Sequence, residues 1–421
     1  MANINNYTYL KGGHLVGYKS IEVLEVNLKK GMNLIIGHNG SGKSNFLEML
    51  AQILLSVNPN RKIDFRYADI AFCLENGEDL IYEITRNISK SNRHIERVDY
   101  ELDEREVQIT QKLTLSDEEI FVTNEDELNS GSFRKYRRSR NRNLGFLISY
   151  FTQFVIDPLF LKFSMPRSMP AVDFPASVVI HLASEDEFWE TDITTFFIRK
   201  LIILAEDKFT DEYYMEGERE NLTEEENKEI FDKYLIEAIK QGGFYKKLII
   251  DQDIIDNLRQ FSPIQDIRFS ENINIFHDER KITIENIKLE FFVNDTWIPW
   301  SQMSDGTKRM FYIISEVTFK KHGIILIEEP EIGIHPHQFE SIMQFLKEQS
   351  EYKQFIISTH SPKALDHLDS DELDHILIAK YEGSRGTTLT NLNAEQMIKA
   401  KEYTEKVGFL SDYWLMSDLE G

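Results

Sequence analysis

A glycine-rich segment, residues 37–44, constrains this chain more than any other part of its sequence. It reads Gly-His-Asn-Gly-Ser-Gly-Lys-Ser and fits the pattern G-x-x-x-x-G-K-[ST]. The pattern of apolar residues predicts a strand before it, at 32–36, and an amphipathic helix after it, from near Ser44 to 58–59. Glycines allow the tight turn that points backbone N–H groups at one spot, and a helix N-terminus adds positive charge there. A phosphate-binding loop is predicted, and a chance glycine-rich turn is the weaker interpretation.

Two side chains of this segment have the chemistry to act on a nucleoside triphosphate. Lys43 can reach the β- and γ-phosphates, and the hydroxyl of Ser44 can ligate Mg²⁺. The predicted cofactors are therefore ATP and Mg²⁺. The nucleotide-binding residues expected here are Gly37, His38, Asn39, Gly40, Ser41, Gly42, Lys43, Ser44 and Asn45.

A second motif combines an apolar strand with acids. Residues 324–327 are apolar and are followed directly by Glu328 and Glu329. Ligand chemistry in open α/β sheets lies at the carboxyl ends of the strands, so both acids are expected at the phosphate site. Glu328 is predicted to hold the Mg²⁺ shell, and Glu329 to polarise the attacking water. A solvated acidic turn is the alternative.

Two further motifs are weaker alone. Ser304 and Gly306 lie at the predicted start of a helix over 305–320, where a serine is either a plain N-cap or part of an anion site. His360 follows a predicted buried strand at 355–358, from which its side chain can reach a γ-phosphate. A lone histidine here is more often structural, but the other three motifs favour a functional one.

The remaining elements are read from local patterns. We expect a strand at 21–28, a hairpin of strands 70–74 and 80–85 with Asn76-Gly77 at its turn, a central strand at 178–182, a hairpin or long strand region at 282–293, and a helix from near Pro336. Short apolar strands alternating with helices indicate an α/β sheet with buried parallel strands.

Together, the four motifs resemble those of an ABC-type ATPase head. More narrowly, they are similar to the soluble group that includes RecF, SMC and the overcoming-lysogenisation-defect (OLD) ATPases. Residues 304–309 resemble the ABC signature, 328–336 the Walker B and D-loop of the OLD-like branch, and 358–362 its switch-histidine loop. The match covers about the first 85 residues and roughly 285–395.

The resemblance implies a mechanism in half-sites. The Walker loops of one protomer bind ATP, and the signature of a second protomer, with Ser304 and Gly306, covers the γ-phosphate in trans. A homodimer or higher homo-oligomer is implied, in which Glu329, His360 and Lys43 are catalytic and hydrolysis is slow. Gln153 is the candidate glutamine of the Q-loop, and Tyr18 the candidate adenine contact.

The expected fold class is α/β: a P-loop NTPase head with a mixed sheet flanked by helices, carrying a large, partly helical insertion. The expected divisions are 1–85 (head, N-terminal part), 86–284 (insertion, second lobe and a dimerisation or sensing arm), 285–395 (head, C-terminal part) and 396–421 (a tail). The tail contains an aromatic segment at 408–416, which either docks a partner or packs onto its own head.

The amino-acid composition limits the class of protein and the compartment in which it works. The chain has 48 basic and 71 acidic residues, a net charge of −23, which works against wrapping nucleic acid with the whole surface. Cys73 is the single cysteine, so an internal disulfide is excluded. The N-terminus lacks an apolar signal core, and the longest apolar stretches are too short and charged to span a bilayer. A cytoplasmic protein without a membrane partner is expected.

The leading functional hypothesis comes from the resemblance to OLD-like ATPases of the Septu, retron-associated and PARIS anti-phage systems. It implies an ATPase subunit that regulates a separately encoded effector, expected to be a nuclease, in response to a phage-derived trigger. Only 61 residues follow His360, and this suggests that the nuclease is another chain.

Three alternatives remain. A RecF- or SMC-like DNA-maintenance ATPase would bind DNA through the basic run 133–142, although this run is more simply a solvated face or a partner for the acidic segment 206–232. A transporter ATPase is disfavoured by the long charged insertion. A metal hydrolase is disfavoured because His335 and His337 lack an apparent third ligand and are more simply a helix cap or solvent contacts.

Overall fold

The computed structural model describes residues 7–55, 64–88, 107–123, 159–162, 176–181, 252–269, 274–278, 281–287, 289–320 and 323–417. The chain divides into two compact units. The first comprises Met1–Ser164 with Lys320–Gly421, and the second is Met165–Phe319. Within the described ranges, no helix is both long and apolar enough to cross a membrane.

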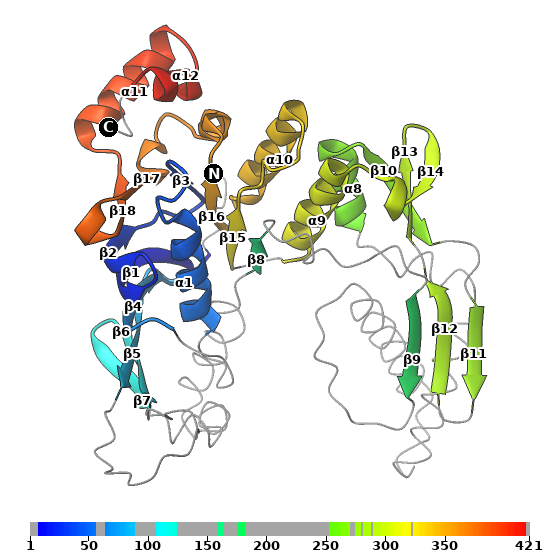
Figure 1. Cartoon of the computed structure of the whole chain (residues 1–421), viewed down its shortest axis with the longest axis horizontal. Helices are drawn as coiled ribbons and strands as arrows, with labels where there is room; N and C mark the ends of the chain where they lie inside the picture. The colour runs from blue at the N-terminus through cyan, green and yellow to red at the C-terminus, as the bar shows by residue number, and fades with distance from the viewer. Residues whose placement is uncertain are drawn as a thin grey trace, which may run out of the picture. The chain divides into compact units, whose positions relative to one another are not determined.

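The first unit begins with an antiparallel sheet of six strands (Figure 1). In pairing order these are β2 (Ile21–Asn27), β1 (Tyr9–Tyr18), β4 (Tyr67–Cys73), β5 (Asp79–Ile88), β6 (Val107–Leu115) and β7 (Glu118–Thr123). The predicted hairpin is confirmed: β4 and β5 pair with Phe72 opposite Leu80. Gly77, with a φ of 85°, supplies the left-handed residue of its turn.

A second six-stranded sheet of this unit carries the phosphate loop. Its order is β18 (Thr387–Asn391), β17 (Ile376–Tyr381), β3 (Met32–Ile36), β16 (Gln354–Thr359), β15 (Ile324–Glu328) and β8 (Leu159–Lys162). All pairings are parallel except that of β18 with β17. Strands β3, β15 and β16 are buried at every position, as expected for central parallel strands covered on both faces.

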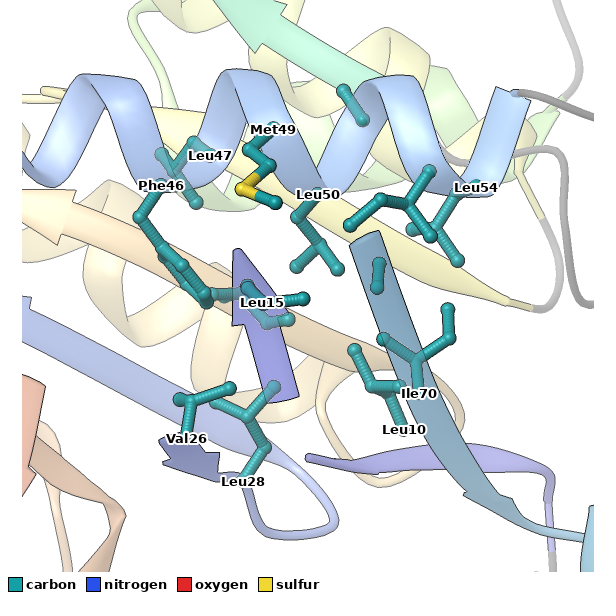
Figure 2. Close-up of a cluster of buried hydrophobic side chains, with 14 of the residues drawn as sticks. Leu10, Leu15, Val26, Leu28, Phe46, Leu47, Met49, Leu50, Leu54 and Ile70 are labelled. Carbon is teal, nitrogen blue, oxygen red and sulfur yellow. The ribbon is translucent and has the colours of Figure 1, made fainter. Parts of the chain in front are cut away.

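Helix α1 (Lys43–Leu55) packs its apolar side against strands of both sheets. Its buried side chains point toward Leu10 and Leu15 of β1, Val26 of β2 and Ile70 of β4 (Figure 2). Fully burying a side chain of this size contributes roughly 1.5–3 kcal/mol. The residues predicted for the buried face are Phe46, Leu47, Met49, Leu50, Ile53 and Leu54, all at most 1% exposed, while Val57 lies outside the described residues.

The C-terminal segment of the first unit forms two helices, α11 (Ala394–Lys406) and α12 (Leu410–Met416). Helix α12 is attached to the 3-10 helix η4 (Pro362–His367). The Asp366 carboxylate accepts from Ser411 N and Ser411 Oγ, each at 2.7 Å, and Lys363 Nζ donates to Ser411 Oγ at 2.9 Å. Leu410 and Trp414 are buried. Packing of the tail onto its own head is therefore observed.

The described residues of the second unit form two three-stranded sheets and the helices α8 and α9. The sheets are β10 (Ile264–Phe269), β13 (Leu289–Val293) and β14 (Thr296–Pro299), and β11 (Asn274–Asp278), β12 (Lys281–Ile287) and β9 (Ala176–His181). Helix α8 (Gln252–Phe261) contacts α9 (Asp305–Phe319), where Asn257 Nδ2 donates to Thr318 Oγ1 at 2.9 Å. Phe291, Trp300 and Phe311 pack together with ring centroids 5.1–5.6 Å apart.

Several expected boundaries differ from those observed. Strand β6 hydrogen-bonds to β5, and β7 hydrogen-bonds to β6, so the first sheet continues past residue 85. Residues 285–319 belong to the second unit, because α9 packs against α8. The region 282–293 is two strands in different sheets, and β9 lies at an edge of its described sheet rather than at the centre.

Candidate functional site

The glycine-rich segment forms a loop between β3 and α1, as predicted. His38, Asn39 and Gly40 are exposed at its tip, and Ser41 N donates to His38 O at 3.2 Å. Gly40 and Gly42 have φ angles of 81° and 99°, which side-chain-bearing residues rarely adopt. A Cβ on Gly42 would lie 1.9 Å from Thr387 Oγ1, so the loop is packed directly against β18.

Lys43 is the first residue of α1, and its side chain is buried under the loop. Its Nζ donates to the carbonyl oxygens of Gly37 at 2.7 Å and His38 at 3.1 Å. It also lies 3.4 Å from His360 Nδ1. A buried ammonium needs such acceptors, because an uncompensated charge in the interior is costly. The loop thus folds around this one cation.

The two acids at the end of β15 differ in environment. Glu328 is 3% exposed. Side chains on a strand alternate between faces, and Ile324 and Leu326 contact the α1 cluster, so Glu328 lies on the face that α1 covers. Glu329 has a φ of 49°, and its N–H donates to Ser358 O at 2.8 Å. Non-glycine residues in this conformation are strained and cluster at functional sites.

His360 connects Lys43 with Glu329. Its Nε2 lies 2.9 Å from Glu329 Oε1, while its Nδ1 faces Lys43 Nζ. An ammonium can only donate, so a neutral imidazole that accepts at Nδ1 and donates from Nε2 satisfies both contacts. Three residues predicted from separate motifs are therefore joined in one hydrogen-bonded chain.

Glu331 belongs to the same site but was not among the predicted residues. Its Oε1 accepts from Thr359 Oγ1 at 2.9 Å and from His360 N at 2.6 Å. The signal in the sequence is a third acid directly after Pro330. That signal indicates an acidic turn, and it does not indicate which donors the carboxylate meets.

Ser20 and Thr387, which were also not among the predicted residues, hold the phosphate loop in place. Ser20 Oγ and Thr387 Oγ1 are 2.7 Å apart, and Asn45 Nδ2 donates to Ser20 Oγ at 2.7 Å. Thr387 N also donates to Ser20 O. These contacts join the β1–β2 turn, the start of α1 and β18. No local pattern predicts them, because their partners lie far apart along the chain.

The signature-like segment lies in the second unit. Ser304 N-caps α9: its Oγ accepts from Thr307 N at 3.2 Å and lies 2.8 Å from Thr307 Oγ1. Such a cap typically contributes about 1 kcal/mol. Gly306 is buried in the first turn of the helix. The N-cap interpretation of Ser304 is thus observed.

Other candidates lie elsewhere. Tyr18 is 4% exposed, and its hydroxyl contacts Glu48 and Gln52 of α1, so it presents no open ring face to a base. His335 caps helix α10 (Pro336–Gln349) by accepting from His337 N, which confirms the cap interpretation. Gln153, the basic run 133–142 and the acidic segment 206–232 lie outside the described residues.

The arrangement has the chemistry to bind and hydrolyse a nucleoside triphosphate. Backbone N–H groups, the α1 N-terminus and Lys43 are gathered at one end of the parallel sheet, with Glu328, Glu329 and His360 beside them. Cations and N–H donors stabilise phosphate charge, and a carboxylate can orient water. These are the components of a P-loop ATPase.

Comparison with known proteins agrees. Residues 32–366 match the family described as "AAA domain, putative AbiEii toxin, Type IV TA system". The match spans most of the chain, from the strand before the phosphate loop to the loop after His360. The chain belongs to this family, and it is a nucleotide-binding ATPase. The resemblance to OLD-like ATPases drawn from the motifs is confirmed.

Two curated relatives are similar. The "Retron Vc95 probable ATPase" of Vibrio cholerae serotype O1 biovar El Tor is 24% identical over 398 residues, covering 86% of this chain and 72% of that protein. "Endonuclease GajA" of Bacillus cereus (strain VD045) is 40% identical over 75 residues, which cover 16% of this chain and 13% of that protein.

Among solved structures, an SMC head bound to the C-winged helix domain of ScpA has a TM-score of 0.48 and 15% identity, covering 93% of this chain and 99% of that chain. The SMC head domain from Thermotoga maritima has a TM-score of 0.42 and 11% identity, covering 91% and 99%.

Proposed function

We propose that the protein is a cytoplasmic ATPase subunit of an anti-phage defence complex, which uses ATP-dependent closure of two heads to regulate a separately encoded effector. The chain of contacts from Lys43 through His360 to Glu329 supports ATP turnover, because it joins a phosphate-binding cation to a water-orienting carboxylate. The relation to a retron ATPase, over most of both chains, supports the setting in defence.

Each residue of the site has a proposed role. The loop 37–42 and Lys43 hold the phosphates, and Asn45 supports the loop through Ser20. The hydroxyl of Ser44 and the carboxylate of Glu328 are oxygen donors of the kind that Mg²⁺ prefers, and both stand at the same end of the sheet. Mg²⁺ would there neutralise phosphate charge. Glu329 orients the attacking water, and His360 holds the Glu329 carboxylate in place through Nε2.

Closure of two heads is proposed to complete the site. Ser304 and Gly306 open α9 with a capped N-terminus, which is suited to meet the γ-phosphate bound by a second copy. The functional unit is then a homodimer or a higher homo-oligomer with two-fold interfaces.

The effector is proposed to dock on the C-terminal helices. Five apolar side chains of this segment are 60–79% exposed: Ile398, Val407, Phe409, Leu415 and Met416. Clustered exposed apolar residues are typical of interaction surfaces. The proposed effector is a nuclease, and a phage-derived molecule is the proposed trigger.

The test is a tagged pull-down from the native gene neighbourhood with ATP present, combined with native mass measurement and a phage challenge. A stoichiometric partner encoded by a neighbouring gene, together with phage protection, is expected. Lys43→Ala should abolish protection because it weakens nucleotide binding, whereas Lys380→Ala, in β17 outside the site, should not. A homodimer that carries DNA and gives no protection would instead support the DNA-maintenance alternative.

A further inference from the structure

The loop that carries His360 is held by a carboxylate from a different segment. Glu331 lies in the turn after β15, and this turn is closed by Ile334 N donating to Glu331 O at 3.1 Å. Its side chain reaches the end of the neighbouring strand β16, where Oε1 meets Thr359 Oγ1 and His360 N. Hydrogen bonds to an ionised acceptor are shorter and stronger than those between neutral groups.

The restraint extends to the next residue. Ser361 N donates to Thr359 Oγ1 at 3.0 Å, and this hydroxyl in turn donates to Glu331 Oε1. Two successive backbone N–H groups, those of residues 360 and 361, are thus tied to one carboxylate oxygen, the second through a fully buried threonine. The backbone from which the imidazole projects has little freedom to turn.

The imidazole needs this restraint because it has two targets on opposite sides. Nδ1 must face Lys43 Nζ while Nε2 faces Glu329 Oε1. A small rotation of the backbone at residue 360 would move the ring away from both of these partner atoms. Glu331 Oε2 is buried without a hydrogen-bond partner among the described residues, which is costly for a carboxylate. The turn alone does not need an acid at this cost.

We propose that Glu331 is a positioning residue for ATP turnover, which aims His360 at Lys43 and Glu329 by accepting hydrogen bonds from Thr359 and His360. The proposal rests on the proposed function of His360. It assigns Glu331 no contact with the nucleotide, so its effect must pass through the imidazole.

The test compares ATP hydrolysis by Glu331→Ala, Glu331→Gln, His360→Ala and the double variant Glu331→Ala/His360→Ala. Glu331→Ala should lower kcat about 10- to 100-fold, the cost of misplacing a reacting group by about 1 Å. Nucleotide affinity should stay within about twofold. Glu331→Gln keeps an acceptor oxygen and should retain most of the activity. The exposed carboxylate of Glu348 on α10 gives a matched control, Glu348→Ala.

The double variant separates positioning from general damage. If Glu331 acts through His360, the double variant should be no slower than His360→Ala alone. Multiplied losses, or a Glu331→Gln variant as slow as Glu331→Ala, would overturn the proposal. If Glu331→Ala does not fold, Thr359→Val removes the bridging hydroxyl and should lower kcat in the same direction.

The same set distinguishes this proposal from the proposed function. Slow turnover in His360→Ala with unchanged turnover in Glu331→Ala would overturn the positioning role alone. Unchanged turnover in His360→Ala would overturn the role of the histidine and the positioning role with it.

Discussion

Gly40 and Gly42 both have positive φ angles, but only one of them is packed against a neighbour. Gly40 has open space where a Cβ would stand, whereas a Cβ on Gly42 would meet the fully buried Thr387. Gly40→Ala should therefore cost about 1 kcal/mol from backbone strain. Gly42→Ala should cost more and weaken ATP binding, because the loop must move away from β18. Thermal unfolding and nucleotide titration of the two variants check this, and equal effects would contradict it.

Glu329→Gln removes the carboxylate that is proposed to orient water and keeps the shape of the side chain. Its kcat for ATP hydrolysis should fall at least about 100-fold, with ATP binding retained. Single-turnover hydrolysis and nucleotide titration measure the two effects separately. Glu348→Gln, at an exposed position of α10, is the matched control. Wild-type turnover in Glu329→Gln would refute the catalytic role.

Burial raises the pKa of the Glu316 carboxyl on α9 above its ordinary value. The folded state therefore favours the protonated form, and stability from this group is present at low pH and is lost as pH rises through the raised pKa. Glu316→Gln should raise the midpoint of thermal unfolding at pH 7 to 8 and change it little below the ordinary pKa of glutamate. A gain that is larger in acid than at neutral pH would contradict this assignment.

At the scale of elements, helix α12 depends on one carboxylate of η4. Asp366 accepts from both the backbone and the hydroxyl of Ser411. Hydrogen bonds to charged groups contribute about 1.5–3 kcal/mol, so Asp366→Ala should release α12 and speed hydrogen exchange in Leu410–Met416. Asp369→Ala is the control, because this aspartate is 70% exposed and its ion pair with Lys347 is near the surface. Unchanged exchange in Asp366→Ala would show that apolar packing alone holds the helix.

Part of the fold and part of the candidate site could be predicted from the sequence. The apolar strand before the loop, the buried side of α1 and the Asn76-Gly77 turn follow from local patterns, because period and turn chemistry depend on neighbours in the chain. Lys43, Glu329 and His360 could be brought together because the carboxyl ends of parallel strands meet at one edge. Glu331, Ser20 and Thr387 could not be assigned, since their partners are set by tertiary packing. The division of 282–293 between two sheets has the same cause.

For the whole molecule, a substitution should be able to block the closure of two heads without affecting nucleotide binding. Ser304→Arg places bulk and charge at the start of α9, away from Lys43 in sequence and in a different unit. In the Glu329→Gln background, ATP should convert the protein that keeps Ser304 into a dimer. The protein that also carries Ser304→Arg should stay monomeric and still bind ATP. Native mass and nucleotide titration check this. Ser304→Ala, which removes the cap without adding bulk, separates blocked closure from the loss of about 1 kcal/mol of helix stability. An ATP-dependent dimer of Ser304→Arg would contradict the proposed interface.

The attachment of α12 to η4 has a mechanical consequence. Lys363 and Asp366, which hold Ser411, lie only three and six residues after His360. A protein or fusion tag that pulls on α12 would therefore pull on η4, which directly follows the loop of His360. We therefore expect a protein bound to α12 to change the rate of ATP hydrolysis, and movement of the histidine loop to change the position of α12 in turn.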